Sequence, residues 1–544
     1  MGLPKKKTKL KAVGSNKLGE KNVGIREQIK NRCTQEIIIA FCGPMGSGVS
    51  TVAKEFIKKL KNYDYTSEYI KITDLIEENS SILPSRIKIP GKANPGERIK
   101  VLQDTGNKLR EKMGNDILAQ FAARKIFISR EKQKEKEETR GKSTKKSSRT
   151  AYIIESLKHP EEVDCLRAIY GDMFYLVGVL CAETMRNRRM AKGKRIPAVA
   201  LTLIMKRDKS EKEPYGQKII KTVQLSDFFI RNNHDKKKQL ESAVMRYLDL
   251  ILGIPGITPY KNEFAMYTAQ SVALLSGCLS RQIGAAITTK EGEIISTGCN
   301  DVPKFGGGLY SEEDGDDGNR CINKHGEKCI NDEQKDFIKE GIEKILKESL
   351  KNIDKLLEKK LTKQEKSLVK KFNDANVVGK LALKIFNETR IKNIIEFSRA
   401  VHAELDAIIG AVNKGITLKG SILYTTTYPC HICARHIVVA GIEKVFYIEP
   451  YEKSLAEELH NDSICLDSSE PNLSSNKVDF LHYEGVAPRQ YLNLFKAREK
   501  MKHNGKLIEV TRQEAIPVVP KNMDTYFEYE KKVVEDLDRR LDKF

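Results

Sequence analysis

Residues 421–442 read SILYTTTYPCHICARHIVVAGI, and this stretch decides the local fold. Up to Tyr428 it is rich in β-branched and aromatic residues, which favours a buried strand. After Pro429 the apolar residues recur at helical spacing, so a helix is expected to follow. Cys430 and Cys433 then share the first turn of that helix, where the helix dipole and unpaired N–H groups favour thiolates.

A second helix start lies upstream, in HAELDAIIGAV, which begins at His402. Histidine and cysteine thiolate are preferred zinc ligands, and three of them leave the fourth tetrahedral position to water. We therefore predict a catalytic Zn²⁺ held by His402, Cys430 and Cys433, with the two helix starts facing one metal. Glu404 is the predicted acid/base and is not a ligand.

Each part of this pattern has an ordinary alternative when taken alone. An isolated C-x-x-C also fits a redox pair or a structural zinc finger, and an isolated histidine fits a core position. The combination is more specific, because H-x-E followed by P-C-x-x-C is a signature of zinc deaminases. No second C-x-x-C is present in the sequence.

From Arg281 to about Leu494 the chain resembles the deoxycytidylate deaminase family, through RQIGAAI, GCNDVP, SRAVHAE, YPCHIC, FYIEPYEKSLA and GVAPRQY. The resemblance implies an α/β/α sandwich whose five-stranded sheet carries the zinc. It also implies that Asn300, which ends a predicted hairpin at 281–300, contacts the sugar of a deoxycytidine nucleotide. Lys453 and Arg489 lie in matched stretches and are candidate phosphate contacts. GCNDVP departs from the family's usual GYNGTP.

A helical insertion interrupts this domain over residues 304–395. Its Lys/Glu-rich stretch has apolar residues at helical spacing, which predicts an exposed helical hairpin. The insertion also holds Cys321, His325 and Cys329, with Cys299 upstream. These residues are candidates for a second, structural zinc site, but no standard finger spacing is met, and unpaired thiols are the alternative.

Near the other end of the chain, GPMGSGVST at residues 43–51 resembles a phosphate-binding loop. It follows the apolar run QEIIIAFCG and precedes a helical pattern, which is the context that such loops require. Val49 stands where the lysine of the G-x-x-x-x-G-K-[ST] pattern belongs. Phosphoryl transfer depends on positioned positive charge, so we predict a nucleotide sensor or a structural relic instead of an active kinase. The candidate nucleotide-binding residues are Gly43, Gly46, Gly48, Ser50 and Thr51.

Two further stretches fit a nucleotide-kinase-like, parallel-sheet domain. TAYIIES at 150–156 reads as a buried strand, and its Glu155 stands where such proteins place an acid beside magnesium. MRNRRMAKGKR at 185–195 reads as an arginine-rich lid helix. The chain is thus α/β throughout. Its expected divisions are a basic tail at 1–35, a P-loop domain at 36–255, a deaminase domain at 262–500 and a helical tail at 501–544.

This layout resembles the two-domain bacterial deoxycytidylate deaminases that act against phage by draining deoxycytidine nucleotides. The resemblance implies dCTP or dCMP as substrate, a homo-oligomer and, in some members, an inhibitory small RNA. Net charge is +22, concentrated in the first residues and at 130–149. Such an excess suits RNA through counterion release, but mixed Lys/Glu runs are also typical of solvated surface.

Other functions and locations were weighed against the composition. A tRNA or single-stranded nucleic-acid base deaminase shares the zinc core, but tryptophan is absent and aromatics are 7%, which disfavours a stacking platform. A pure nucleotide-binding regulator would not need Glu404. No run reaches membrane-spanning length, and the basic N-terminus lacks the apolar core of a secretory signal. With thinly spread cysteines, this predicts a cytoplasmic protein without a membrane contact.

Overall fold

The computed structural model describes residues 33–84, 87–91, 94–139, 149–194, 196–233, 237–323, 329–357, 360–372, 374–451, 453–466, 476–496, 502–503, 505–518 and 523–542. Within these residues the chain is mixed α/β and forms two six-stranded sheets that are mainly parallel. Most of the basic tail, the run 140–148 and His325 lie outside the described residues.

The first sheet has the strand order β12-β5-β4-β1-β3-β2. Its strands from the first part of the chain are β1 (Ile37–Cys42), β2 (Thr66–Lys71), β3 (Thr150–Leu157), β4 (Phe174–Leu180) and β5 (Phe228–Arg231). These five run parallel to one another. Every residue of β1 and β4 is buried, which is expected where helices cover both faces of a parallel sheet.

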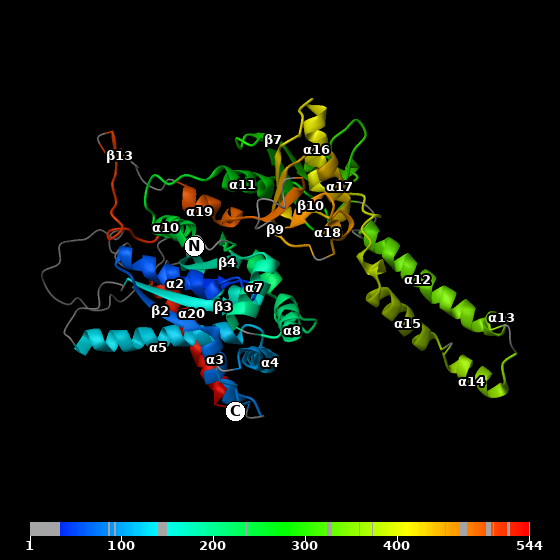
Figure 1. Ribbon diagram of the computed structural model, residues 1–544, viewed down its shortest axis with the longest axis horizontal. Coiled ribbons are helices and arrows are strands. Elements are labelled where there is room, and N and C mark those ends of the chain that lie inside the picture. The colour runs from blue at the N-terminus through cyan, green and yellow to red at the C-terminus, as the bar shows by residue number, and fades with distance from the viewer. Residues whose placement is uncertain are drawn as a thin grey trace, which may run out of the picture.

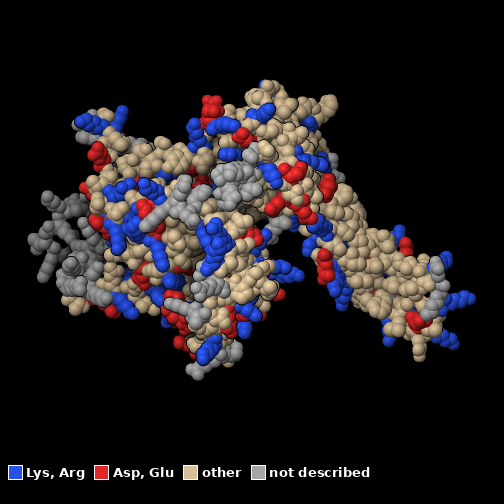
Figure 2. Space-filling model, in the orientation of Figure 1, with Lys and Arg blue, Asp and Glu red and all other residues tan. Residues whose placement is uncertain are grey.

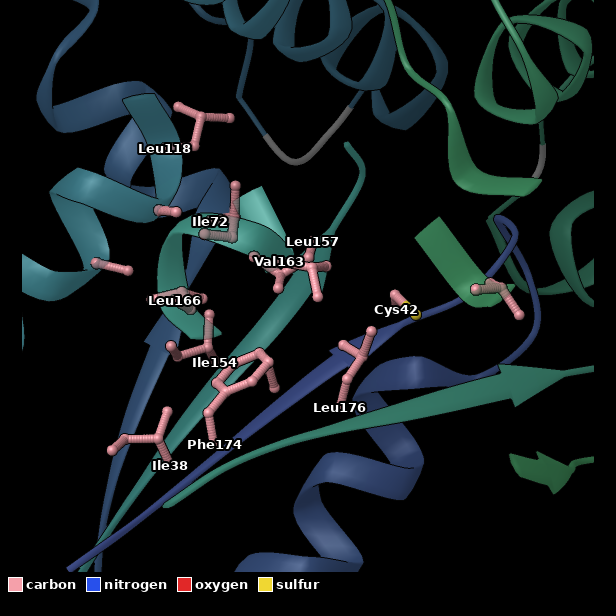
Figure 3. Packing of buried hydrophobic residues seen from close by; sticks show 14 of the residues in the cluster. Ile38, Cys42, Ile72, Leu118, Ile154, Leu157, Val163, Leu166, Phe174 and Leu176 are labelled. Atoms are coloured by element: carbon pink, nitrogen blue, oxygen red, sulfur yellow. The ribbon is translucent and has the colours of Figure 1, made fainter. Parts of the chain in front are cut away.

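Alternate residues of β1 enter two different apolar clusters. The helices around this sheet are α2 (Val49–Leu60), α3 (Ile72–Glu78), α4 (Pro95–Met113), α5 (Ile117–Thr139), α6 (Pro160–Tyr170), α7 (Glu183–Lys194), α8 (Ala198–Lys209), α9 (Ile219–Gln224) and α10 (Lys237–Ile251). On one face Ile38 belongs to the same apolar cluster as Ile154 and Val163 of α6, part of which Figure 3 shows. On the other face Ile39 packs with residues of α2 and α10, such as Phe56.

The second sheet has the order β10-β11-β9-β8-β6-β7. Its strands are β6 (Gly284–Thr288), β7 (Ile294–Cys299), β8 (Ile422–Thr427), β9 (Lys444–Glu449), β10 (Ile464–Leu466) and β11 (Val478–His482). β6 and β7 form the predicted antiparallel hairpin, and β8 onward run parallel. The sheet has six strands where the resemblance implied five, because the short β10 adds one at the edge.

Helices cover both faces of the second sheet. They are α11 (Lys261–Ala273), α16 (Ala403–Asn413), α17 (His431–Val439) and α18 (Ala456–Leu459), while α19 (Tyr491–Phe495) packs with α10 beside the first sheet. α16 packs closely on β7, since a Cβ at Gly298 would lie 2.4 Å from the Ala403 carbonyl oxygen. Only glycine fits there, and this contact fixes the start of α16, which bears the predicted site residues. α11 packs on the opposite face through Ala265 and Ala269.

The two sheets are tied together by chain segments that cross between them. β12 (Gly485–Val486) follows the second sheet in sequence but pairs antiparallel with β5 at the edge of the first. The buried Glu263 of α11 accepts the Val486 N–H at 3.0 Å and pairs with Arg246 of α10 at 2.7 Å. Sequence periodicity did not predict this crossing, which makes the two parts one packed unit.

The last helix also returns to the first sheet. α20 (Met523–Leu541) packs along α5, with the small pair β13 (Lys502–His503) and β14 (Lys506–Leu507) preceding it. Glu530 of α20 is buried, accepts the Tyr170 hydroxyl at 2.5 Å and pairs with Arg130. A buried carboxylate is stable only with such partners, so they hold α20 in place.

The insertion projects from the second sheet as a long helical arm (Figure 1). It consists of α12 (Ile330–Lys351), α13 (Ile353–Leu356), α14 (Lys363–Phe372) and α15 (Ala375–Glu388), and α12 packs against α15. Charged side chains are sparse on much of its visible face in Figure 2. The base of α12 lies against the loop that leads to His402, which brings the arm to the predicted site.

Candidate functional site

The strand-to-helix change predicted around Pro429 is present. β8 ends at Thr427, and α17 begins at His431 with Cys430 as its N-cap. The Cys430 sulfur accepts the Cys433 N–H at 3.4 Å, so the thiolate caps the helix as a carboxylate or hydroxyl often does. His402 is likewise the N-cap of α16.

The three predicted ligands converge. His402 Nδ1 lies 3.2 Å from Cys430 Sγ and 3.3 Å from Cys433 Sγ. Their ligand atoms all lie within 4.8 Å of one another, and they are the one such group of His, Cys, Asp and Glu found in the described part of the chain. Two sulfurs and one imidazole nitrogen form a donor set that suits zinc and leaves a fourth position open. We call these three residues the metal centre.

The charges of the metal centre favour cation binding. The pKa of Cys430 is lowered well below that of an ordinary thiol, first because the Cys433 thiol hydrogen-bonds to it and then because His402 does. The pKa of His402 is raised to about 9 by its hydrogen bond with Cys430. The hydrogen bond with Cys430, and next burial, raise the pKa of Cys433 instead. The centre is therefore a thiolate beside an imidazolium and a neutral thiol, and a metal ion would bind by displacing the protons on His402 and Cys433.

Glu404 lies beside the metal centre on the first turn of α16. It is buried, and its Oε2 accepts a hydrogen bond from the Cys433 thiol at 3.4 Å. Burial, and next the charge on Cys430, raise the pKa of Glu404 to about 6. A carboxyl group with a pKa near neutrality both accepts and donates protons readily, which is the property that an acid/base requires.

A cavity of about 410 Å³ opens over these residues. His402, Glu404 and Cys430 line one end of it, and the base of α12 lines another part. This volume lies within the range of small-molecule sites. Lys453 also lines the cavity, as the matched stretch suggested. Arg489 is not among its lining residues: its guanidinium pairs with Asp227 of the first sheet at 3.4 Å.

Asn300 lines the cavity, but its amide also organises the cavity wall. Its Oδ1 accepts the Ile283 N–H at 2.6 Å, and its Nδ2 donates to the Arg281 carbonyl at 2.8 Å. The side chain therefore fixes the loop before β6. A contact with a nucleotide sugar would use the remaining donor capacity of the amide.

Two of the candidate residues for a second zinc site lie in the same cavity wall. Cys321 and Cys329 line the cavity together with Cys278, while Cys299 is not among the lining residues. His325 lies outside the described residues. All eleven cysteines are free of disulfides.

The predicted phosphate loop, residues 43–51, joins β1 to α2. The glycines at 46 and 48 have left-handed φ values of 82° and 88°, which glycine adopts without strain. The N–H groups of Gly46, Gly48, Val49 and Ser50 have no hydrogen-bond partner among the described residues. Such a set of N–H groups at a helix start is suited to an anion.

Side chains from other elements surround this loop. Glu155 accepts hydrogen bonds from the hydroxyls of Ser50 and Tyr69, so this acid lies beside Ser50 of the loop. From α7, Arg189 lies with Nη1 3.5 Å from the Ser47 carbonyl oxygen, and Arg186 contacts the loop similarly. Position 49 has no positive charge, but α7 places two arginines against the loop.

Comparison with known proteins bears on the second sheet. Residues 259–449 match the family model described as the cytidine and deoxycytidylate deaminase zinc-binding region. The deoxycytidylate deaminase of Enterobacteria phage T2 is 43% identical over 54 residues, which are 10% of this chain and 29% of that enzyme. ComE operon protein 2 of Bacillus subtilis (strain 168) is 40% identical over 55 residues, 10% and 29% of the two chains. The match thus spans less than a third of each relative's length.

Solved structures of several kinds align with parts of the chain at low TM-scores. A dCMP deaminase from the cyanophage S-TIM5, in complex with dCMP and dUMP, aligns with 42% of this chain and 100% of its own at 17% identity and a TM-score of 0.21. A shikimate kinase from Acinetobacter baumannii aligns with 40% of this chain and 94% of its own at 12% identity and a TM-score of 0.22.

None of the described helices is both long and apolar enough to span a membrane.

Proposed function

We propose that the protein is a zinc-dependent hydrolase that deaminates the cytosine of deoxycytidine nucleotides. One observation carries the proposal: a zinc-type donor set contacts a buried carboxyl with a raised pKa, and that carboxyl lines one cavity together with the ligands His402 and Cys430. The match of residues 259–449 to the deaminase zinc-binding model supports it. A kinase-like first domain, fused to a deaminase-like second one, completes the proposed architecture.

Bound Zn²⁺ would supply Lewis-acid activation of a water molecule at the position that His402, Cys430 and Cys433 leave open. Glu404 takes a proton from the attacking water and delivers it to N3 of cytosine, so that the ring accepts oxygen at C4. Glu404 then takes the second proton from the oxygen now bonded to C4 and passes it to the amino group at C4. The C4–N bond breaks, and ammonia and a uracil nucleotide are released.

A direct assay tests this proposal. Purified protein is incubated separately with deoxycytidine, dCMP and dCTP, and ammonia release and the conversion of cytosine to uracil are followed. We expect turnover of at least one nucleotide by protein that contains zinc. Turnover of cytosine only within tRNA or single-stranded DNA would instead support the alternative of a nucleic-acid base deaminase.

We further propose that the phosphate loop binds a nucleotide phosphate without transferring it. The four N–H groups without partners support binding, and Val49 removes the lysine on which transfer depends. Arg189 supplies a neighbouring positive charge. Calorimetry with ATP and dNTPs tests the proposal: wild-type protein should bind a nucleotide, the Arg189→Ala variant should bind it more weakly, and no phosphorylated product should form.

The biological role that we propose is depletion of the deoxycytidine nucleotide pool as a defence against phage. It rests on the resemblance of the two-domain layout, which also suggests a homo-oligomer held inactive by a small RNA. Expression in a phage-sensitive host tests the role. Survival after infection should depend on Glu404, and the dCTP pool should fall only with active protein.

A further inference from the structure

The cavity over the metal centre has a second end that the insertion builds. Ile330, Asn331, Asp332 and Lys335, all from the first turns of α12, line it. Arg281, which precedes β6, lines the same cavity, and both Arg281 and Lys335 lie close enough to Lys453 to act on its charge. The arm is therefore part of the cavity wall and is not attached at a distance from it. A nucleotide whose base reaches Glu404 would extend toward these residues.

Positive charge is concentrated at this second end. Four cationic side chains line the cavity: Arg281, Lys335, Arg399 and Lys453. The carboxyl groups in the lining are Asp332 and Glu404, so four cations stand against two carboxyl groups. The lining therefore has a net positive charge before any ligand binds.

Arg281 has an ion-pair partner, Glu449, at 3.5 Å, but the other three cations are less well compensated by the protein itself. The Lys335 side chain is only 14% exposed, and its ion-pair partner Asp332, 3.3 Å away, is 64% exposed. Arg399 Nη1 is buried without a hydrogen-bond partner among the described residues. Burial and then repulsion from Lys335 lower the pKa of Lys453. Cations held close together in this way are stabilised by an anion between them.

We propose that the insertion helix α12 forms the phosphate end of the substrate site and that Lys335 is a specificity-determining residue that favours nucleotides with more phosphate groups. This rests on the proposed deaminase function. The base lies at the metal centre, and the phosphates lie among Lys335, Lys453 and Arg281. A second and third phosphate extend the anion toward α12, so the contribution of Lys335 increases from nucleoside to triphosphate.

The test compares three substrates across matched variants on one helix. Charge-assisted hydrogen bonds correspond to roughly tenfold to a hundredfold in affinity. For Lys335→Ala we expect kcat/KM to fall at least about tenfold with dCTP, less with dCMP and not at all with deoxycytidine, mainly through KM. Lys335→Arg should restore most of the dCTP value. Lys344→Ala removes an exposed lysine farther along α12 and should change no substrate.

Equilibrium binding provides a second readout that does not require turnover. In protein that carries Glu404→Gln, adding Lys335→Ala should weaken dCTP binding and leave deoxycytidine binding unchanged. Equal losses for all three substrates, or no loss with dCTP, would overturn the role of Lys335 while wild-type turnover upholds the deaminase. Wild-type protein that deaminates none of them would overturn the proposed function itself, and this inference with it.

Discussion

The metal centre and the phosphate loop are built from the same local parts, a strand end, a short loop and the start of a helix. In the metal centre the side chains His402, Cys430 and Cys433 converge beside Glu404, at one end of a cavity. In the phosphate loop the backbone N–H groups are available, but Val49 replaces the reactive lysine. In both regions the helix start favours a bound anion or a charged side chain, but the surrounding side chains determine whether a reaction can be catalysed there.

The largest expected effect comes from removing a ligand from the metal centre. In Cys430→Ala, two donors are left, which do not hold zinc as three do. We expect the zinc content to fall by one ion per chain and deamination to be lost. Metal analysis and the ammonia assay measure both. Cys465→Ala, which removes a thiol from β10, is the matched control, and an unchanged zinc content in Cys430→Ala would contradict the assignment.

A second substitution separates metal binding from proton transfer. Glu404→Gln keeps all three ligands but removes the acid/base, so zinc should stay and turnover should fall by roughly 10²–10⁴-fold, toward the upper end because Glu404 serves several transfers. Nucleotide binding at the phosphate loop should be unaffected. Turnover within tenfold of wild type would remove Glu404 from the mechanism.

The sequence predicted the metal centre well because its chemistry is specified by residue type and local spacing. His402 and Glu404 share one helix start, and Cys430 and Cys433 share another, so short segments position them. The same reasoning located the β6–β7 hairpin and the helices of the arm. Local patterns suffice wherever the functional atoms come from one turn of helix or one strand end.

Contacts between distant segments were not predictable in this way. Arg489 lies in a stretch that matched the deaminase family, yet its partner is Asp227, on the other sheet. β12 joins the first sheet after the chain has completed most of the second. Lys335 is one of many lysines in a charged helix, and only the packing of α12 places it in the cavity. Such pairings depend on tertiary packing, which periodicity does not encode.

The excess of positive charge raises the question of whether RNA binds the protein and inhibits deamination. If the lysines at positions 5–11 contact RNA, about five neutralised phosphates would weaken binding on the order of a hundredfold between 50 and 200 mM salt. Replacing these five lysines with alanine should flatten that dependence, as measured by filter binding across salt concentrations. RNA bound in this way should also suppress deamination. Activity unaffected by any RNA from the native host would leave the segment as solvated surface.

The smallest expected effect is at the phosphate loop, where Val49→Lys restores the written motif. Val49 is 9% exposed and belongs to the apolar cluster between β1 and α2, so a lysine must leave that cluster to reach a phosphate. We expect nucleotide affinity to rise by about tenfold at most, because one charge-assisted contact is offset by lost burial. Val49→Met, which adds length without charge, is the control.

Calorimetry and a phosphoryl-transfer assay distinguish nucleotide binding from phosphoryl transfer. We expect no transfer, since a lysine alone does not supply the positioned acceptor and lid that transfer requires. Transfer from ATP at ordinary kinase rates, by either wild-type or variant protein, would show that the two regions differ less than their side chains indicate.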